Sequence, residues 1–119
     1  MELVLAHPAD RGELADAAAR GDDLCAAVLS VLSNAVVEIK ARGGIGCVAC
    51  RRLVGSRAAR RGTFALAHWE DDVWGYRLFC ERCAGQQAAD LLDQAAESLL
   101  AELRFELHGA GAVAAVGNA

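Results

Sequence analysis

Hydrophobic positions at helical spacing predict a long helix in the first half of the chain. Over residues 23–41 apolar side chains recur three or four positions apart, which places them on one face of a helix. Asp22 or Asp23 would cap its start, and Gly43 with Gly44 would end it. A shorter, alanine-rich helix is expected over residues 13–20. The apolar stripe of the long helix consists of Leu24, Val28, Leu32, Ala35, Val36 and Ile39.

A second amphipathic helix is predicted near the C-terminus, over residues 84–108. Its apolar positions again fall three or four apart, and Gly109 would end it. Residues 109–119 are small and glycine-bearing, and we expect them to form a flexible tail. The stripe offers a surface for another helix of this chain, for a second copy, or for another protein. Its large members, the predicted interaction face, are Leu92, Leu99, Leu103 and Leu107.

A different pattern lies between the helices. Residues 63–69 and 73–79 carry aromatic and β-forming side chains and are separated by a short acidic turn, which predicts a β-hairpin. On the second strand Trp74, Tyr76 and Leu78 share one face, and Val73, Arg77 and Phe79 share the other. Residues 1–5 form either a strand or a disordered start, and residues 51–62 are expected to be a loop.

These elements predict a helix-dominated α+β fold in a single domain of 119 residues. It divides into an N-terminal helical segment (1–43), a finger with a hairpin (44–83), the C-terminal helix (84–108) and the tail (109–119). Hydrophobic residues make up 55% of the chain but aromatic residues only 5%, which favours helices. Because a chain of this size buries only a modest core, a metal ion would add useful stability.

Two pairs of cysteines carry the clearest chemical signal. Cys47 and Cys50 form one C-x-x-C motif, and Cys80 and Cys83 form another. Each motif places two thiolates on one turn, and four thiolates make the closed tetrahedral set that one structural zinc ion favours. The odd number of cysteines argues against a complete disulfide framework. Free thiols, redox-active disulfides, a zinc-ribbon geometry and an iron–sulfur cluster remain as alternatives.

The order of these features resembles the treble-clef zinc finger. That family combines a C-x-x-C knuckle, a β-hairpin and a helix whose first turn carries the second ligand pair. Cys47 and Cys50 match the knuckle, residues 63–79 match the hairpin, and Cys80 and Cys83 match the helix start. The resemblance covers residues 46–108 and implies one structural zinc ion. It does not imply a function, because the family serves nucleic-acid binding, protein binding and catalysis alike.

Charge is distributed unevenly along the chain. The net charge is −4, yet residues 41–69 hold six arginines and no acidic residue. The arginine-rich loop 51–61 is therefore a candidate contact for phosphates or for an acidic protein surface. Trp69, Trp74 or Tyr76 would stack on unpaired bases if exposed. The candidate contact residues are Arg51, Arg52, Arg57, Arg60, Arg61 and Arg77.

The remaining candidates carry little chemistry. His7, His68 and His108 lie far apart in the sequence, and no phosphate-binding loop or catalytic motif is present. His68 fits a hairpin side chain and Cys25 a core position. We therefore expect neither an enzyme nor a small-molecule substrate. With no apolar run of about 18 residues and no signal peptide, the sequence indicates a cytoplasmic, reducing environment and no membrane partner.

The sequence favours a small protein-interaction module over the other classes. Two long amphipathic helices account for more of the chain than the arginine-rich loop does, and the acidic remainder would repel a long nucleic acid. Such a regulator, adaptor or inhibitor would bind another protein or itself as a homodimer. The alternative is a nucleic-acid-binding zinc finger that uses loop 51–61.

Overall fold

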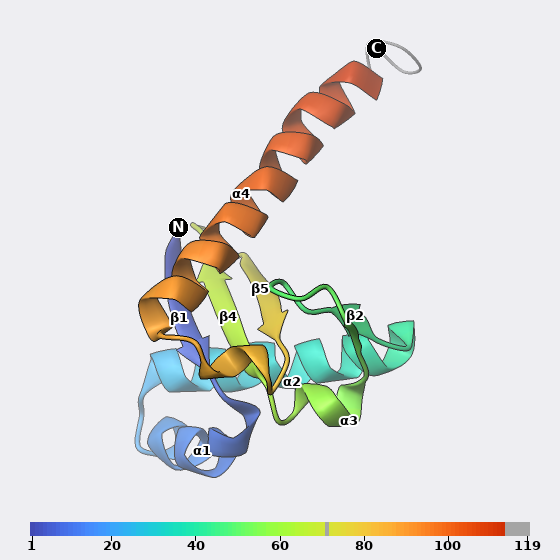
Figure 1. The fold of residues 1–119 in the computed structure, drawn as a ribbon. Helices are drawn as coiled ribbons and strands as arrows, with labels where there is room; N and C mark the ends of the chain where they lie inside the picture. Colours follow the sequence, from blue (N-terminus) through green and yellow to red (C-terminus); the bar gives the residue numbers. More distant parts are fainter. Residues whose placement is uncertain (71, 114–119) are drawn as a thin grey trace.

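The computed structural model describes residues 1–70 and 72–113, with the side chains of the last helix described as far as Leu103. A three-stranded sheet forms the centre, and the C-terminal helix crosses it and extends beyond it (Figure 1). The elements before the cysteine region are β1 (Glu2–Ala6), the 3-10 turn η1 (Pro8–Asp10), α1 (Arg11–Ala19) and α2 (Asp23–Arg42). The molecule is mixed α+β, as the sequence predicts.

The sheet has the order β1-β4-β5, with every neighbouring pair antiparallel. The predicted hairpin is confirmed as β4 (Thr63–His68) and β5 (Trp74–Phe79). On the other side of β4, β1 pairs with it so that Ala6 faces Phe64. The start of the chain therefore forms a strand, over residues 2–6, rather than a disordered segment. Because β4 is central, its residues Thr63 to Ala67 are all buried.

Helix α2 begins and ends with the signals that its sequence predicts. The carboxylate of Asp22 accepts a hydrogen bond of 3.0 Å from the N–H of Cys25, which caps the first turn. At the other end Gly43 adopts a left-handed conformation with φ of 79°. The N–H of Gly44 then donates to the carbonyl of Ile39 at 3.0 Å, as in a Schellman motif.

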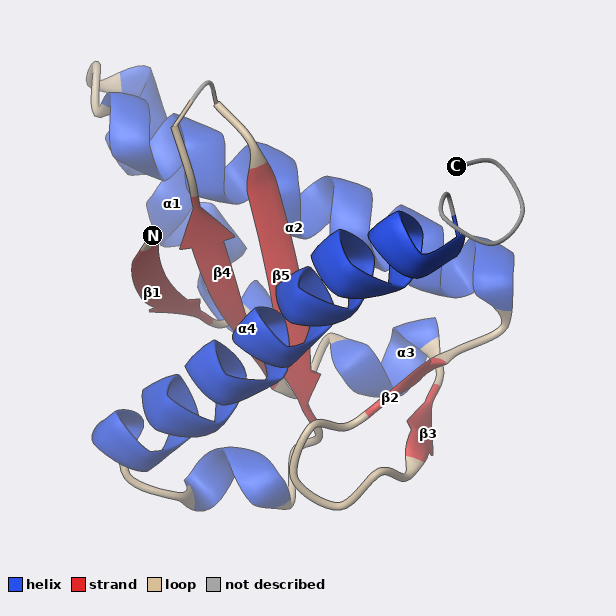
Figure 2. Cartoon of the chain, turned by 90° about the horizontal axis from the view of Figure 1, so that it is seen from above, coloured by secondary structure: helices blue, strands red, loops and turns tan. Residues whose placement is uncertain are grey.

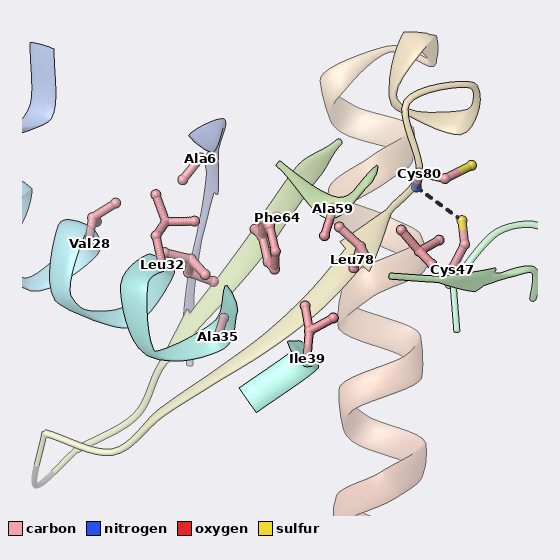
Figure 3. Packing of buried hydrophobic residues seen from close by; sticks show 12 residues of the cluster. Ala6, Val28, Leu32, Ala35, Ile39, Cys47, Ala59, Phe64, Leu78 and Cys80 are labelled. Carbon is pink, nitrogen blue, oxygen red and sulfur yellow. Dashed lines mark hydrogen bonds between the residues drawn. The ribbon is translucent and has the colours of Figure 1, made fainter. Parts of the chain in front are cut away.

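The buried stripe of α2 packs on one face of the sheet (Figure 3). Phe64, Leu66 and Leu78 point toward this face from the two hairpin strands. Leu24, at the first turn, is instead 56% exposed, so the stripe is shorter than its sequence period predicts. The α2 residues that are buried are Val28, Leu32, Ala35 and Ile39.

By length and composition alone, α2 could cross a membrane, although its sequence contains no unbroken apolar run of that length. The core helix of a soluble protein has the same two properties. Part of the apolar character of α2 belongs to its stripe on the sheet and to half-buried side chains beside it such as Val31 and Val36, while Leu24 and Val37 are exposed.

Helix α4 (Ala88–Val113) packs on the opposite face of the sheet, against Ala65 and Phe79. The helix contributes Leu91 and Ala95 to this contact. The sheet therefore lies between α2 and α4 (Figure 2). The alternative in which the stripes of the two long helices pack directly against each other is therefore wrong. Alternate residues of each strand point to opposite faces, and both faces of this sheet are apolar, so each helix has its own surface to cover.

Several predicted boundaries also differ. The C-terminal helix begins at Ala88, because Gln86 is extended (φ −67°, ψ 162°) and separates the helix from the turn that holds Cys83. At the other end the helix continues through Gly109 to Val113. A glycine inside a helix costs roughly 1 kcal/mol but does not end it. The remainder of the predicted tail, 114–119, and the side chain of Leu107 lie outside the described residues.

The predicted loop 51–62 also has structure of its own. It contains the second strand of a small sheet, β3 (Leu53–Val54), which pairs with β2 (Ile45–Gly46). A single helical turn, α3 (Ser56–Ala59), follows. Ala59 on this turn is fully buried in the core that α2 forms with the sheet, which anchors the segment.

Candidate metal centre

The first cysteine pair lies on a tight turn between β2 and β3. The carbonyl of Cys47 accepts a hydrogen bond of 2.8 Å from the N–H of Arg51, and its N–H donates to the carbonyl of Arg52 at 2.9 Å. Arg51 adopts a positive φ of 63°, which closes the turn. Both sulfur-bearing residues of the motif thus sit on a knuckle whose two flanks are paired strands.

The second cysteine pair lies where β5 ends. Cys80 directly follows the strand, and Cys83 opens the 3-10 turn η2 (Cys83–Gly85). The carbonyl of Cys80 accepts a hydrogen bond of 2.8 Å from the N–H of Ala84, so this pair also lies on a turn. The pair precedes the first turn of α4 rather than lying within it.

Backbone hydrogen bonds hold the two turns together. The N–H of Val48 donates to the carbonyl of Leu78 at 2.9 Å, which fixes the knuckle against the end of β5. The N–H of Cys80 donates to the sulfur of Cys47 at 3.3 Å (Figure 3). As a result, cysteines that are about thirty positions apart in the sequence face one another.

The four sulfur atoms have the spacing of a tetrahedral metal site. All lie within 4.8 Å of one another. The sulfurs of Cys50 and Cys80 are 3.8 Å apart, and a tetrahedron with metal–sulfur bonds of about 2.3 Å has edges of about 3.8 Å. A disulfide would require a distance of about 2.05 Å. All four cysteines are free in this structure, and they are positioned to bind one metal ion.

The same spacing decides between one ion and a cluster. In an iron–sulfur cluster, several irons and bridging sulfides separate the cysteine ligands. Four sulfurs that all approach within 4.8 Å leave room for one ion at their centre. The site is closed on its inner side by Cys47 and Cys80, which are buried, and is open to solvent at Cys50.

The surroundings shift the pKa values of Cys47 and Cys83 in opposite directions. Burial raises the pKa of Cys47, but hydrogen bonds from the backbone N–H groups of Cys50, Cys80 and Ala49 outweigh it and lower the value to about 7. Burial and the neighbouring sulfurs raise the pKa of Cys83 to about 12. Four crowded thiols therefore cannot all ionise by themselves, and a bound cation would relieve their mutual repulsion.

The other sequence candidates lie away from this centre. The ring of His68 stacks on Trp74 with ring centroids 4.4 Å apart, so it is a hairpin side chain, as the sequence suggests. Cys25 is half-buried on α2 and lies outside the described core clusters. In the predicted interaction face, Leu99 is buried and Leu103 is 38% exposed, while Leu92 is half-buried.

The candidate arginines do not gather at one place. Arg52 and Arg61 line a cavity beside Cys80, whereas Arg60 lines another cavity next to Pro8. Arg51 and Arg77 line a third, between the knuckle and α4. Arg57 is exposed on α3. The loop arginines are solvent-accessible, but the fold spreads them over several surfaces.

Some contributors to the site could not be found from residue types. The backbone N–H groups that lower the pKa of Cys47 carry no sequence signature, and neither does the hydrogen bond from Val48 to Leu78. The side chains that join β5 to α4 were also missed. Arg77 donates to Ser98 at 2.9 Å and pairs with Glu102. Their positions on α4 gave no signal beyond the helical period.

Fold and site together define this chain as a mixed α+β protein with four cysteines positioned to bind one metal ion. Among known proteins, no family model, no curated protein and no solved structure matches it.

Proposed function

We propose that this chain is a zinc-stabilised protein-interaction module of a reducing intracellular compartment. The observation that supports it best is the four-sulfur cluster, which joins the knuckle to the end of β5. Helix α4, which follows the second cysteine pair, extends beyond the sheet (Figure 1). Zinc suits four thiolates in a tetrahedron. Such a centre keeps no open position for water, so we assign the ion a structural role and propose no catalysis.

The order of knuckle, hairpin and helix supports a treble-clef variant. In this variant the second ligand pair would sit at the start of a 3-10 turn, and four residues would separate Cys83 from the start of α4. The interaction surface would be the helix side of the molecule, where Leu100 and Leu103 are 41% and 38% exposed. A helix that presents leucines to solvent is suited to contact another protein.

Two measurements test this function. Elemental analysis of protein purified without added metal should give one zinc per chain. Cross-linking in a lysate of the source cell should then give a defined complex that the double variant Leu100→Glu, Leu103→Glu loses while keeping its zinc. Absence of zinc would refute the metal assignment, and a complex unaffected by the double variant would refute the helix as the contact surface.

The nucleic-acid alternative has one observation in its favour. Arg52, Arg61 and Arg82 line a single cavity of about 370 Å³ beside Cys80. If these arginines met phosphates, affinity for oligonucleotides would fall linearly in log salt, with a slope that counts the contacts. Fluorescence anisotropy across a salt series measures that slope. No binding at low salt would exclude this alternative.

A further inference from the structure

A groove runs along the outer edge of β5. It is a cavity of about 370 Å³ bounded by α2 on one side and by α4 on the other. Since β4 is central and β5 is the last strand of the sheet, this groove opens onto a free strand edge. The residues that line it include Glu38, Arg42, Trp74, Tyr76, Leu99 and Leu103.

The backbone at this edge is available for pairing. In an antiparallel strand the N–H and C=O of one residue point to the same side, and every second residue repeats that direction. The carbonyl of Leu78 points away from β4, toward Val48. The backbone N–H and C=O groups of Tyr76 and Trp74, two and four positions earlier, therefore point away from β4 as well. Within residues 1–70 and 72–113, the N–H of Tyr76 and both backbone groups of Trp74 have no backbone partner.

The knuckle bounds this free edge at one end. Because Val48 already occupies the carbonyl of Leu78, only the part of β5 near Trp74 and Tyr76 remains open. Arg77 donates to the carbonyl of Tyr76 at 2.8 Å. A carbonyl oxygen has two lone pairs, so a second donor can still bind there.

Each wall of the groove carries an ion pair, and the α4 wall adds apolar side chains. On the α4 side Leu103 and the buried Leu99 lie beside the pair of Arg77 with Glu102. The ring of Trp69 lies over Gly75, where a side chain would collide with it at 2.9 Å. On the α2 side Glu38 and Arg42 form an exposed ion pair of 3.0 Å. Successive side chains of an added strand would point alternately to the two walls.

We propose that this groove binds an extended peptide segment of another protein, which adds to β5 as a fourth strand. The segment would alternate apolar side chains, which contact Leu103 and the ring of Trp69, with charged ones, which contact Glu38 and Arg42. Strand addition obtains its affinity from backbone hydrogen bonds and its specificity from pockets for alternate side chains. This inference rests on the proposed protein-binding function and names the kind of partner that the function requires.

The test begins with a phage-displayed library of random decapeptides selected on the zinc-loaded full chain. Selected peptides should alternate apolar and charged residues. Each backbone amide of the best peptide is then N-methylated in turn. Because only every second amide of an added strand faces its neighbour, methylation at alternate positions should weaken binding by about tenfold or more. Uniform effects, or a selection that yields no binder, would overturn the proposal.

A pair of matched variants locates the contact. Leu103→Arg should weaken binding of the peptide by about tenfold, since it replaces an apolar contact on the α4 wall with a charge. Leu24→Arg changes another exposed leucine, on α2 and away from the groove, and should have no effect. If Leu103→Arg instead converts a dimer into a monomer, a second copy occupies the groove and the proposal fails. If peptides do not bind but the cross-linked complex persists, the groove is refuted and the interaction function stands.

Discussion

Among single residues, the structure shows how neighbours alter acidity at two unrelated places. At the metal centre, backbone N–H groups stabilise the thiolate of Cys47 against the cost of burial. In the groove, burial raises the pKa of Tyr76 above its usual 10.0, and the carboxylate of Glu38 raises it further. The shift at Cys47 comes from backbone groups, which a substitution cannot remove. Part of the shift at Tyr76 comes from the side chain of Glu38, which a substitution can remove.

Glu38→Gln should therefore lower the pKa of Tyr76 toward 10.0. Tyr76 is the only tyrosine, so the ultraviolet absorbance of the phenolate reports it alone. Because the folded pKa is above the unfolded one, the contribution of Tyr76 to stability is present below pH 10 and is lost as pH rises through the folded pKa. The variant should lose less stability in alkali. Glu81→Gln serves as the control, because Glu81 pairs with Arg61. If both variants shifted the pKa of Tyr76 equally, Glu38 would not be the cause of the raised value.

Residue types alone could predict the metal ligands, because the two C-x-x-C motifs fix which side chains meet an ion. They could not predict the unequal acidity of Cys47 and Cys83, which depends on donors and burial that only the folded chain supplies. The same holds for Arg77. The sequence made Arg77 a candidate contact for nucleic acid or an acidic partner, whereas in the fold its side chain is 21% exposed and bonded to α4.

Single elements were predicted well where local signals act alone. The cap at Asp22 and the glycine end of α2 depend on residues within one turn, and both are present as predicted. The start of α4 was misplaced, because the tertiary requirement that Cys83 face Cys47 holds residues 83–86 outside the helix. The sequence did not decide whether residues 1–5 form a strand or a disordered start. The strand β1 depends on pairing with β4, about sixty residues away, which no local signal reveals.

Cys83→Ser should remove the ion and destabilise the finger. Serine is a poor ligand for a soft ion, and a structural zinc ion contributes to folding directly, so the loss should be about 3 kcal/mol or more. For a domain of this size that corresponds to a melting temperature lower by roughly 10 °C or more. Differential scanning calorimetry and elemental analysis measure the two effects. Cys25→Ser, outside the cluster, should keep full zinc content, and unchanged stability in Cys83→Ser would contradict a structural ion.

The arginines on and just after the helical turn α3 are expected to contribute little to stability. Replacing Arg57, Arg60 and Arg61 together by alanine should leave the fold intact. All three side chains are exposed. Within residues 1–70 and 72–113 they form one ion pair, Arg61 with Glu81 at 3.2 Å, a surface pair worth at most about 1 kcal/mol. The melting temperature should change by only a few degrees. A variant that unfolds would show that the segment supports the core through these side chains, and circular dichroism would detect it.

For the whole molecule, the sheet combines two separate cores. The α2 side contains Phe64 and Leu78 and extends to Cys47 and Cys80, whereas the α4 side contains Ala65 and Phe79. The amphipathic stripes predicted two such surfaces but not their arrangement, because one helical period fits packing on a helix as well as packing on a sheet. The alternation of apolar residues on both faces of the strands decides it.

This arrangement predicts that metal removal unfolds the molecule locally. An ion held by the four sulfurs would join the knuckle to the end of β5, whereas Val28 and Leu32 pack on Phe64 and Leu66 without it. A chelator should therefore abolish amide-exchange protection over residues 45–54 and 80–86, while β4 and the middle of α2 keep theirs. Hydrogen exchange read by mass spectrometry resolves these segments, and added zinc should restore the lost protection. Uniform loss along the chain would instead mean that the ion holds the entire domain as one cooperative unit. In that case the sheet and α2 could not serve as a scaffold for the groove when the metal is absent.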